Sequence, residues 1–182
     1  MTERFEYRVD RNNVVISVSD NWRAFAADNN GKASVMPEHV VGMPLEDAIA
    51  DDETRALYAL VINSVRRNNR PVVFDFRCDA PAERRFCEMR VTPGDDGSVD
   101  FESTTVRTEP RKPASLLQAE VPRSETEFVK VCSACGRVPD EEGRWMELEQ
   151  AIRHLNLTGR ERMPRISHGL CEDCHWKVLE AL

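Results

Sequence analysis

Residues 72–106 read VVFDFRCDAPAERRFCEMRVTPGDDGSVDFESTTV, and this stretch decides the fold that we expect. It contains three runs rich in β-branched and aromatic residues, at 72–78, 85–91 and 98–106. The sequence Pro-Gly-Asp-Asp-Gly at 93–97 separates the last two runs and is a typical hairpin signal. The stretch therefore predicts three consecutive antiparallel strands.

Two further strands and short helices are expected before this stretch. Residues 5–9 alternate apolar and charged side chains, the period of a half-buried strand, and residues 14–18 form a second, more buried run. Ser19 or Asp20 then caps a short helix. Two glycines and two prolines within residues 29–44 predict a loop or broken helical turns.

The clearest helix is expected to begin at Asp51 or Asp52. Its apolar stripe consists of Leu57, Leu60, Val61 and Val65. Acidic residues lie in the first turn of this helix, and Arg66 and Arg67 lie in its last turn, an arrangement that the helix dipole favours. Pro71 prevents the helix from continuing. The order is thus two strands, short helices, one longer helix and three strands.

Residues 4–107 resemble a PAS domain in this order of elements and in three segments. The segments are VVISVSDNWRAFA at 14–26, VVGMPLEDAI at 40–49 and FRCDAPAERRFCEMRVTP at 76–93. The resemblance implies an α+β fold with a five-stranded antiparallel sheet and helices over one face. It also implies a sensory domain that binds a small ligand or serves as a dimerising or relay module, and it leaves the ligand unknown.

Two cofactors of PAS domains fit the residues poorly. Flavin-binding members carry Asn-Cys-Arg at the start of the long helix, whereas Cys78 and Cys87 lie in predicted strands. Haem-binding members use a histidine, and the candidate here, His39, lies in a loop where we expect a solvated or hydrogen-bonded side chain. We expect Cys78 and Cys87 to be small buried apolar residues, with a redox pair across the strands as the alternative.

The composition excludes several partners. The chain of 182 residues has a formal net charge of −7, so it repels phosphate backbones and anionic lipids, and we expect neither nucleic acid nor a membrane as a partner. No apolar run approaches the roughly 20 residues that span a bilayer. Charges occupy the N-terminal segment where a secretory signal is apolar. We therefore expect a cytoplasmic protein with reduced thiols.

A proline-containing segment is expected to divide the chain. Residues 108–124 contain three prolines and little periodicity, which predicts a semi-stiff linker, although Leu116 and Leu117 can dock on the first unit. This linker separates a PAS-like unit, residues 1–107, from a C-terminal module, residues 125–182.

The C-terminal module is expected to be small and α-rich. One helix is predicted to place the following residues on a single face: Trp145, Leu148, Ile152 and Leu155. A basic loop through Gly159 and Pro164 follows, and a last short helix is expected at 175–182.

Two C-x-x-C pairs, Cys132 with Cys135 and Cys171 with Cys174, enclose residues 136–170. Each pair can direct two thiolates at one ion from a tight turn, and two such pairs complete the tetrahedral four-cysteine shell of structural zinc. A module this small has little core, so a bound metal supplies much of its stability. The spacing therefore predicts one structural Zn²⁺ held by the four cysteines.

Residues 128–179 also resemble the cysteine-rich tail that follows PAS domains and response-regulator receivers in many bacteria. The matching segments are VCSACGRV-x-DEEGRW, which begins at Val131, and ISHGLCEDC at 166–174. The middle loop LNLTGRERMPR at 155–165 and the residue His175 depart from that pattern. The resemblance implies a signalling accessory and names no reaction.

Other interpretations of the cysteines stay open. Cys171 or Cys174, near the start of the last helix, can have a lowered thiol pKa and act in redox exchange, which is compatible with a zinc ion released on oxidation. Residues 171–175 also match the C-x-x-C-H pattern of covalent haem attachment, which normally requires export and leaves the first pair unexplained. A nucleic-acid-binding ribbon is opposed by the net acidity of residues 125–182.

The histidines of the module are expected to support the site rather than form it. His168 is predicted to donate a hydrogen bond to a sulfur, since four thiolates already fill the shell, with a ligand or a turn residue as alternatives. His154 is expected at the surface. No role is assigned to His175.

No catalytic constellation is recognisable in the sequence. It has no phosphate-binding glycine loop, no kinase phosphoacceptor or ATP-binding region, and no supported Ser-His-Asp set. The acidic runs at 46–53 and 140–142 are expected to be a helix start and a solvated loop. We therefore expect a non-enzymatic bacterial signal-transduction protein that forms a homodimer and contacts a protein partner. The alternative is a thiol redox sensor or oxidoreductase that uses the C-x-x-C pairs.

Overall fold

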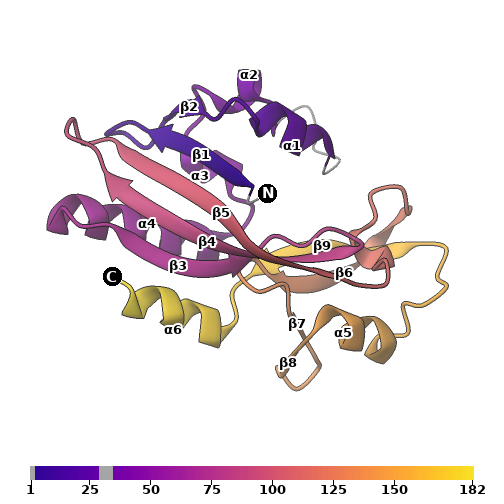
Figure 1. Cartoon of the computed structure of the whole chain (residues 1–182). Helices are drawn as coiled ribbons and strands as arrows, with labels where there is room; N and C mark the ends of the chain where they lie inside the picture. Colours follow the sequence, from indigo (N-terminus) through magenta and orange to yellow (C-terminus); the bar gives the residue numbers. More distant parts are fainter. Residues whose placement is uncertain (1–2, 29–34) are drawn as a thin grey trace.

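The computed structural model describes residues 3–28 and 35–182 and contains a five-stranded antiparallel sheet (Figure 1). Its strands, in the spatial order β2-β1-β5-β4-β3, are β1 (Arg4–Val9), β2 (Val15–Val18), β3 (Val72–Arg77), β4 (Glu83–Pro93) and β5 (Val99–Pro110). The predicted five-stranded antiparallel sheet is thus confirmed. Part of the predicted loop at 29–44, residues 29–34, lies outside the described residues.

Between β2 and β3, the described residues form four α-helices. They are α1 (Trp22–Asp28), α2 (Pro37–Val40), α3 (Leu45–Ala48) and α4 (Asp52–Asn68). The Asp51 side chain caps α4 by accepting a hydrogen bond of 2.8 Å from the Thr54 backbone N–H. Asn69, in the left-handed conformation, ends α4. The predicted start of the long helix is therefore confirmed.

The side of the sheet that faces α4 forms the core. Leu57, Val61 and Val65 of the predicted helix stripe are buried, whereas Leu60 is 46% exposed, so the stripe is narrower than predicted. Phe101, on the central strand β5, stacks between the rings of Tyr7 and Tyr58, with centroid distances of 4.5 and 6.0 Å. Aromatic packing thus joins β1, β5 and α4.

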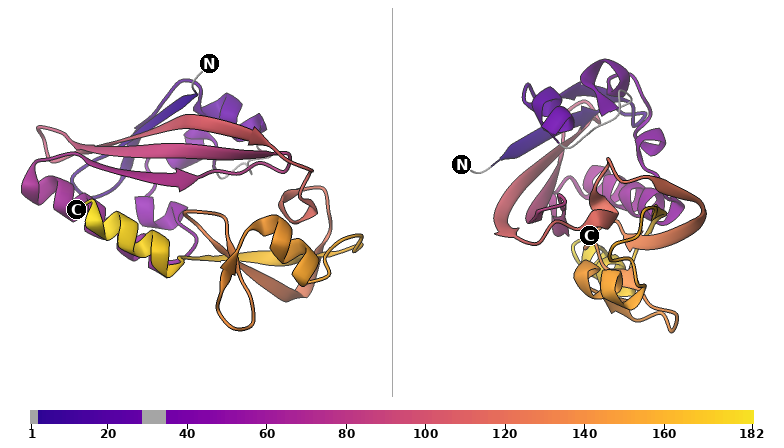
Figure 2. Two further views of the ribbon diagram at one scale, coloured as in Figure 1. Left: turned by 60° about the horizontal axis from the view of Figure 1, so that its bottom comes forward. Right: turned by 90° about the vertical axis from the view of Figure 1, so that its right-hand side faces the viewer.

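The opposite side of the sheet carries charged side chains. Arg8 and Asp100 lie opposite each other on β1 and β5 and pair at 2.6 Å, and Arg4 pairs diagonally with Glu102, which lies opposite Glu6. Figure 2 shows α4 and the last helix (yellow) together beneath the sheet, away from this charged side. The alternation of apolar and charged residues in the strands therefore separates a covered from an open face.

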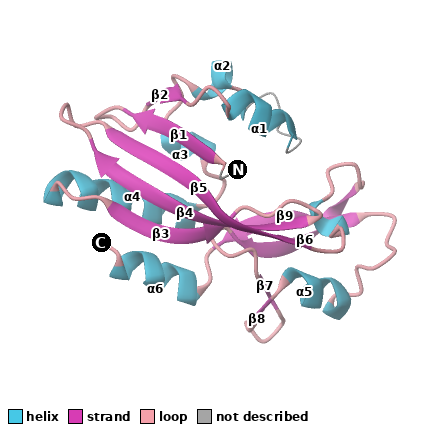
Figure 3. Ribbon diagram, viewed as in Figure 1, coloured by secondary structure: helices cyan, strands magenta, loops and turns pink. Residues whose placement is uncertain are grey.

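The C-terminal part combines strands and helices, which corrects the expectation of an α-rich module (Figure 3). Its elements are β6 (Arg123–Cys132), β7 (Val138–Pro139), β8 (Trp145–Met146), α5 (Leu148–His154), β9 (Met163–Gly169) and α6 (Glu172–Glu180). β6 and β9 pair in parallel, and β7 and β8 form a short antiparallel pair. Trp145 therefore lies in a strand rather than on the predicted helix. The predicted basic loop continues into β9.

The segment expected to be a linker is largely packed. β5 runs on to Pro110, and a short 3₁₀ turn, η2 (Ser115–Leu117), follows. Leu116 is fully buried in a second core cluster with Val129, Leu148 and Met163. It docks on the C-terminal elements, not on the first unit as suggested by the sequence.

The C-terminal helix belongs to the core of the large sheet. Val178 of α6 and the cysteines Cys132 and Cys171 lie in the same buried cluster as the residues of α4 and the sheet. The Ser64 hydroxyl of α4 donates a hydrogen bond of 3.1 Å to the carbonyl oxygen of Leu182. Residues of both predicted units therefore contribute to this core, while the cluster around Leu116 forms a second one. Within the described ranges, no helix has the length and apolar character needed to cross a membrane.

Replacing Phe101 by alanine tests this core. Phe101→Ala removes a fully buried ring from the central strand, so we expect the free energy of unfolding to fall by about 3–5 kcal/mol. The matched control is Val106→Ala on the same strand, where the side chain is 67% exposed, and it is expected to cost less than about 1 kcal/mol. Urea denaturation measures both, and equal losses would contradict the packing described.

Candidate metal centre

The parallel pairing of β6 with β9 brings the two C-x-x-C pairs together. Cys132, the last residue of β6, lies opposite Gly169, the last residue of β9. The Ser133 backbone N–H donates a hydrogen bond of 2.8 Å to the Gly169 carbonyl oxygen and extends the pairing by one step. Parallel strands that are paired to their last residues end at the same edge of the sheet. The second cysteine pair starts with Cys171, two residues after Gly169, and therefore lies beside the first pair.

The first pair lies in a closed turn. The Gly136 N–H donates to the carbonyl oxygen of Cys132 at 2.9 Å, and the Cys132 N–H donates to that of Arg137 at 2.8 Å. Gly136 has a φ of +70°, a left-handed conformation that favours glycine. Gly136, directly after the first pair, therefore lets the chain fold back beneath the Cys132 and Cys135 thiols.

The second pair lies at the start of α6. Cys171 is the residue before the first helical residue, and Cys174 is in the first turn. The His175 N–H donates to the Cys171 carbonyl oxygen at 3.0 Å and closes that turn. A helical turn thus holds two thiols at fixed spacing, facing the turn of the first pair.

The four sulfur atoms converge on one point. The Sγ atoms of Cys132, Cys135, Cys171 and Cys174 all lie within 4.8 Å of one another. Those of Cys135 and Cys171 are 3.7 Å apart. Sulfur ligands of a tetrahedral ion at bond lengths of about 2.3 Å lie about 3.8 Å from each other. The arrangement can therefore hold one metal ion.

The other thiols of the cluster stabilise negative charge on the Cys132 sulfur. Hydrogen bonds from the Cys135 and Cys174 thiols and from the Cys171 N–H hold the pKa of the Cys132 thiol far below its ordinary value. In donating to Cys132, the Cys135 thiol has its pKa raised to about 12. The pKa of Cys174 is raised for the same reason. Four thiols this close share protons through hydrogen bonds, so that only some of them can be ionised at once. A cation bound at the centre would replace these protons and allow all four thiols to be ionised.

Two carboxylates at the start of α4 bind the loops that carry the cysteines. Asp51 accepts a hydrogen bond of 2.9 Å from the Ser133 hydroxyl, next to Cys132. Glu53 accepts one of 2.7 Å from the Leu170 N–H, next to Cys171, and pairs with Lys130 of β6 at 3.4 Å. The sequence suggested only a helix start here. Nothing local in the sequence indicates these contacts, because their partners lie far along the chain.

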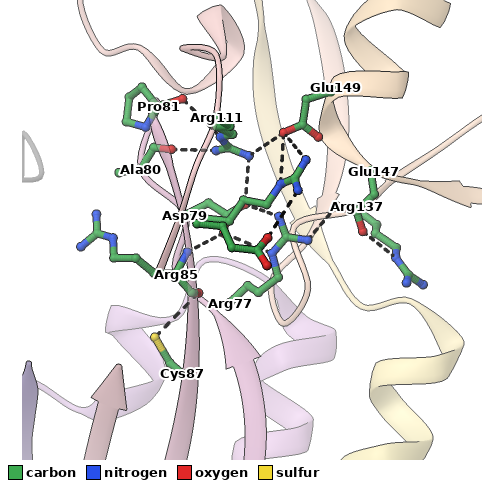
Figure 4. A network of polar contacts seen from close by, with 12 residues as sticks. Arg77, Asp79, Ala80, Pro81, Arg85, Cys87, Arg111, Arg137, Glu147 and Glu149 are labelled. Atoms are coloured by element: carbon green, nitrogen blue, oxygen red, sulfur yellow. Dashed lines mark hydrogen bonds and ion pairs between the residues drawn. The ribbon is translucent and has the colours of Figure 1, made fainter. Parts of the chain in front are cut away.

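The end of β3 holds the first cysteine loop from the other side. The Arg77 N–H donates to the Ala134 carbonyl oxygen at 2.7 Å, inside the first C-x-x-C pair. The Arg77 guanidinium pairs with Asp79 and with Glu147, and Arg111 also pairs with Asp79 (Figure 4). Figure 4 also shows the extension of this network to α5 through Glu149. β3, β5 and α5 are thus joined beneath the cysteine loop.

These charges are buried and mutually neutralised. The side chains of Arg77, Asp79 and Arg111 are 9%, 8% and 3% exposed. Burial by itself lowers the pKa of Arg77, but its bonds to Asp79 and Glu147 raise it overall. Burial would raise the pKa of Glu147, and the bond from Arg77 lowers it overall. The network is therefore ionised as a unit, and removal of one member would leave an uncompensated buried charge.

The histidines beside the second cysteine pair are exposed. His168 is the last residue but one of β9. Among the described residues it makes no hydrogen bond to a cysteine sulfur, so that predicted contact is not formed. His175 is exposed, and its ring lies 6.3 Å from that of Trp176.

The two remaining cysteines are separate from the cluster. Cys87 is buried and Cys78 is partly buried, and both are free thiols. Burial is the largest cause that raises the pKa of each. Protonated thiols are poor nucleophiles, so this environment agrees with the predicted role as small apolar residues.

A likeness to known proteins is found among solved structures. No protein-family model matches the chain, and no curated protein matches it. Among 16 matching chains of solved structures is a domain of an HTR-like protein from Haloarcula marismortui, with 16% sequence identity and a TM-score of 0.38. The match covers 59% of this chain and 96% of that one. At this TM-score the likeness carries no argument about function.

Replacing Asp79 tests the charge network beneath the cysteine loop. Asp79→Ala leaves the guanidinium groups of Arg77 and Arg111 buried with one carboxylate fewer, and we expect a loss of about 3 kcal/mol in the free energy of unfolding. Asp100→Ala, which removes an exposed partner of Arg8, is the control and is expected to cost less than about 1 kcal/mol. Guanidinium denaturation compares them, and an unchanged stability of Asp79→Ala would refute the role of the network.

Proposed function

We propose that Cys132, Cys135, Cys171 and Cys174 hold one structural Zn²⁺ in a non-enzymatic signal-transduction protein. The observation that carries the metal is the convergence of four sulfur atoms within 4.8 Å from two segments far apart in the chain. A ligand set made only of thiolates suits zinc better than hard cations. Two of these cysteines, Cys132 and Cys171, are almost fully buried, as expected of a closed structural site.

The sensory part of the proposal rests on the first unit. Its antiparallel sheet of five strands with helices over one face is the architecture implied by the resemblance to PAS domains. We propose that this PAS-like unit senses a small ligand or mediates homodimerisation in the bacterial cytoplasm. The metal-bound tail would then present a surface to a regulatory protein, as expected for a chain in which we recognise no output enzyme.

A second candidate, a thiol redox sensor, is favoured by the same sulfur geometry. The Cys135 and Cys171 sulfurs are 3.7 Å apart, and Cys135 and Cys174 are only partly buried. A two-electron oxidant such as a peroxide would convert two thiols to a disulfide, with two electrons and two protons passing to the oxidant to form water. If the thiolates held a metal, the same oxidant would remove two electrons from them and the metal would be released. The two candidates differ in the oxidation state of the purified protein.

Metal analysis and thiol counting on protein purified without reductant separate the two candidates. We expect one zinc per chain by mass spectrometry. In the native protein, the four clustered thiols should resist a colorimetric thiol reagent. Denaturation with a chelator should expose all six cysteines to the reagent. A metal-free protein with a reversible two-electron oxidation would instead support the redox sensor and refute structural zinc.

A single substitution tests the ligand set. Cys174→Ser removes one thiolate, and we expect the zinc affinity to fall by about tenfold or more and the melting temperature of the metal-bound protein to drop. Cys78→Ser is the matched control, because this thiol lies in the sheet region outside the cluster, and zinc binding should be unchanged. Competition with a chromophoric chelator measures both affinities. Equal zinc affinity in the two variants would exclude Cys174 as a ligand.

A further inference from the structure

A cavity of about 510 Å³ lies between the large sheet, helices α2 to α4 and the first cysteine loop. Its volume falls within the range of roughly 300–1,000 Å³ that is typical of small-molecule sites. Val15, Leu45 and Ile49 provide an apolar wall, and the rings of Tyr7, Trp22 and Tyr58 provide an aromatic one.

The polar tips of these aromatic side chains are already engaged. The Trp22 indole N–H donates to the Val35 carbonyl oxygen at 2.9 Å. The Tyr7 and Tyr58 hydroxyls are hydrogen-bonded to each other, and burial is the largest cause that raises the pKa of each, for Tyr58 to about 12. The interior therefore offers mainly apolar and aromatic surface to a ligand.

The charged groups at the rim are also paired within the protein. Arg77 is held by Asp79 and Glu147. Asp51 accepts hydrogen bonds from the Thr54 N–H and from the Ser133 hydroxyl. A charged ligand would have to displace one of these bonds, whereas an uncharged ligand leaves them intact.

One wall of the cavity is the candidate metal centre itself. Cys132, Ser133 and Gly136 all line it, so the first C-x-x-C loop encloses the site together with the helices. The same loop is fixed by the Ser133–Asp51 bond and by the Arg77–Ala134 backbone bond. The shape of the cavity therefore depends on the position of the cysteine loop.

We propose that this composite cavity binds an uncharged, largely apolar molecule about the size of three aromatic rings, and that the metal-bound cysteine loop forms its closing wall. This deepens the sensory half of the proposed function by naming a ligand class and a link to the metal. The wall contributed by residues 132–136 makes the site incomplete without the C-terminal part.

The test uses the full chain and the neutral fluorescent probe N-phenylnaphthylamine. We expect saturable binding with enhanced, blue-shifted emission. Ala48→Trp fills the cavity from the exposed helix α3, where a larger side chain does not disturb the core, and it should raise the probe Kd by about tenfold or more. Ala56→Trp, at an exposed helical alanine on α4 that does not line the cavity, is the matched control and should bind like the unsubstituted chain.

A second measurement does not depend on filling the cavity. Bound probe should quench tryptophan fluorescence through Trp22, so quenching should be strongly reduced in Trp22→Phe and retained in Trp176→Phe. The anionic analogue anilinonaphthalene sulfonate should bind more weakly than the neutral probe. Equal affinity in Ala48→Trp and Ala56→Trp, or preference for the anionic probe, would overturn the proposal.

Zinc content measured on the same samples separates this proposal from the proposed function. Removal of zinc by a chelator should weaken probe binding, because the closing wall loses its anchor. If the chain carries no metal, binds the probe, and binds it more weakly after Ala48→Trp, the ligand site in the cavity is supported and the zinc proposal fails. If the chain carries zinc and the probe does not bind, the cavity proposal fails and the zinc proposal stands.

Discussion

The parallel pairing of β6 with β9 is the constraint on which the cysteine cluster depends. A shift of this register would separate Cys132 from Cys171, since the two turns start where the two strands end. Two strands alone are marginally stable in water, so the pair needs other support. Leu116 and Leu148 pack in one apolar cluster with residues of β6 and β9 and supply part of this support. A metal ion at the strand ends would supply the rest, because it closes the long segment between the two C-x-x-C pairs.

The cysteine loops are also held by the other half of the molecule, through α4 and β3. Asp51 caps α4 and also accepts a hydrogen bond from the Ser133 hydroxyl, so one carboxylate stabilises both a helix end and a cysteine loop. A helix cap contributes about 1 kcal/mol, and a displaced loop would remove one of the partners that orient this cap. Arg77 holds the loop from β3 through its backbone and from α5 through Glu147. A metal ion on the four cysteines would therefore be mechanically connected to the fold of the first unit.

Local patterns explain which parts could be predicted from the sequence. The alternation of apolar and charged residues located the strands of the large sheet, and the spacing of the cysteines located the cluster, because both signals lie within a few residues. β9 was not predicted, since Pro164 and Arg165 interrupt its pattern and its partner strand is distant. The prolines of residues 108–124 predicted a semi-stiff linker and could not reveal that Leu116 is buried. Contacts such as Glu53 with Leu170 have no local pattern at all.

The shared loop has a thermodynamic consequence for the proposed sensory role. If a ligand in the cavity and a metal on the cysteines both favour the same position of Cys132 and Ser133, each must raise the affinity of the other by the same factor. The chain needs no separate relay for this coupling, because Ser133 lies between the metal ligands and the start of α4. A small apolar molecule could then change metal retention, and loss of the metal could change ligand retention. The direction of signalling would be set by whichever of the two varies in the cell, while the physical link stays the same.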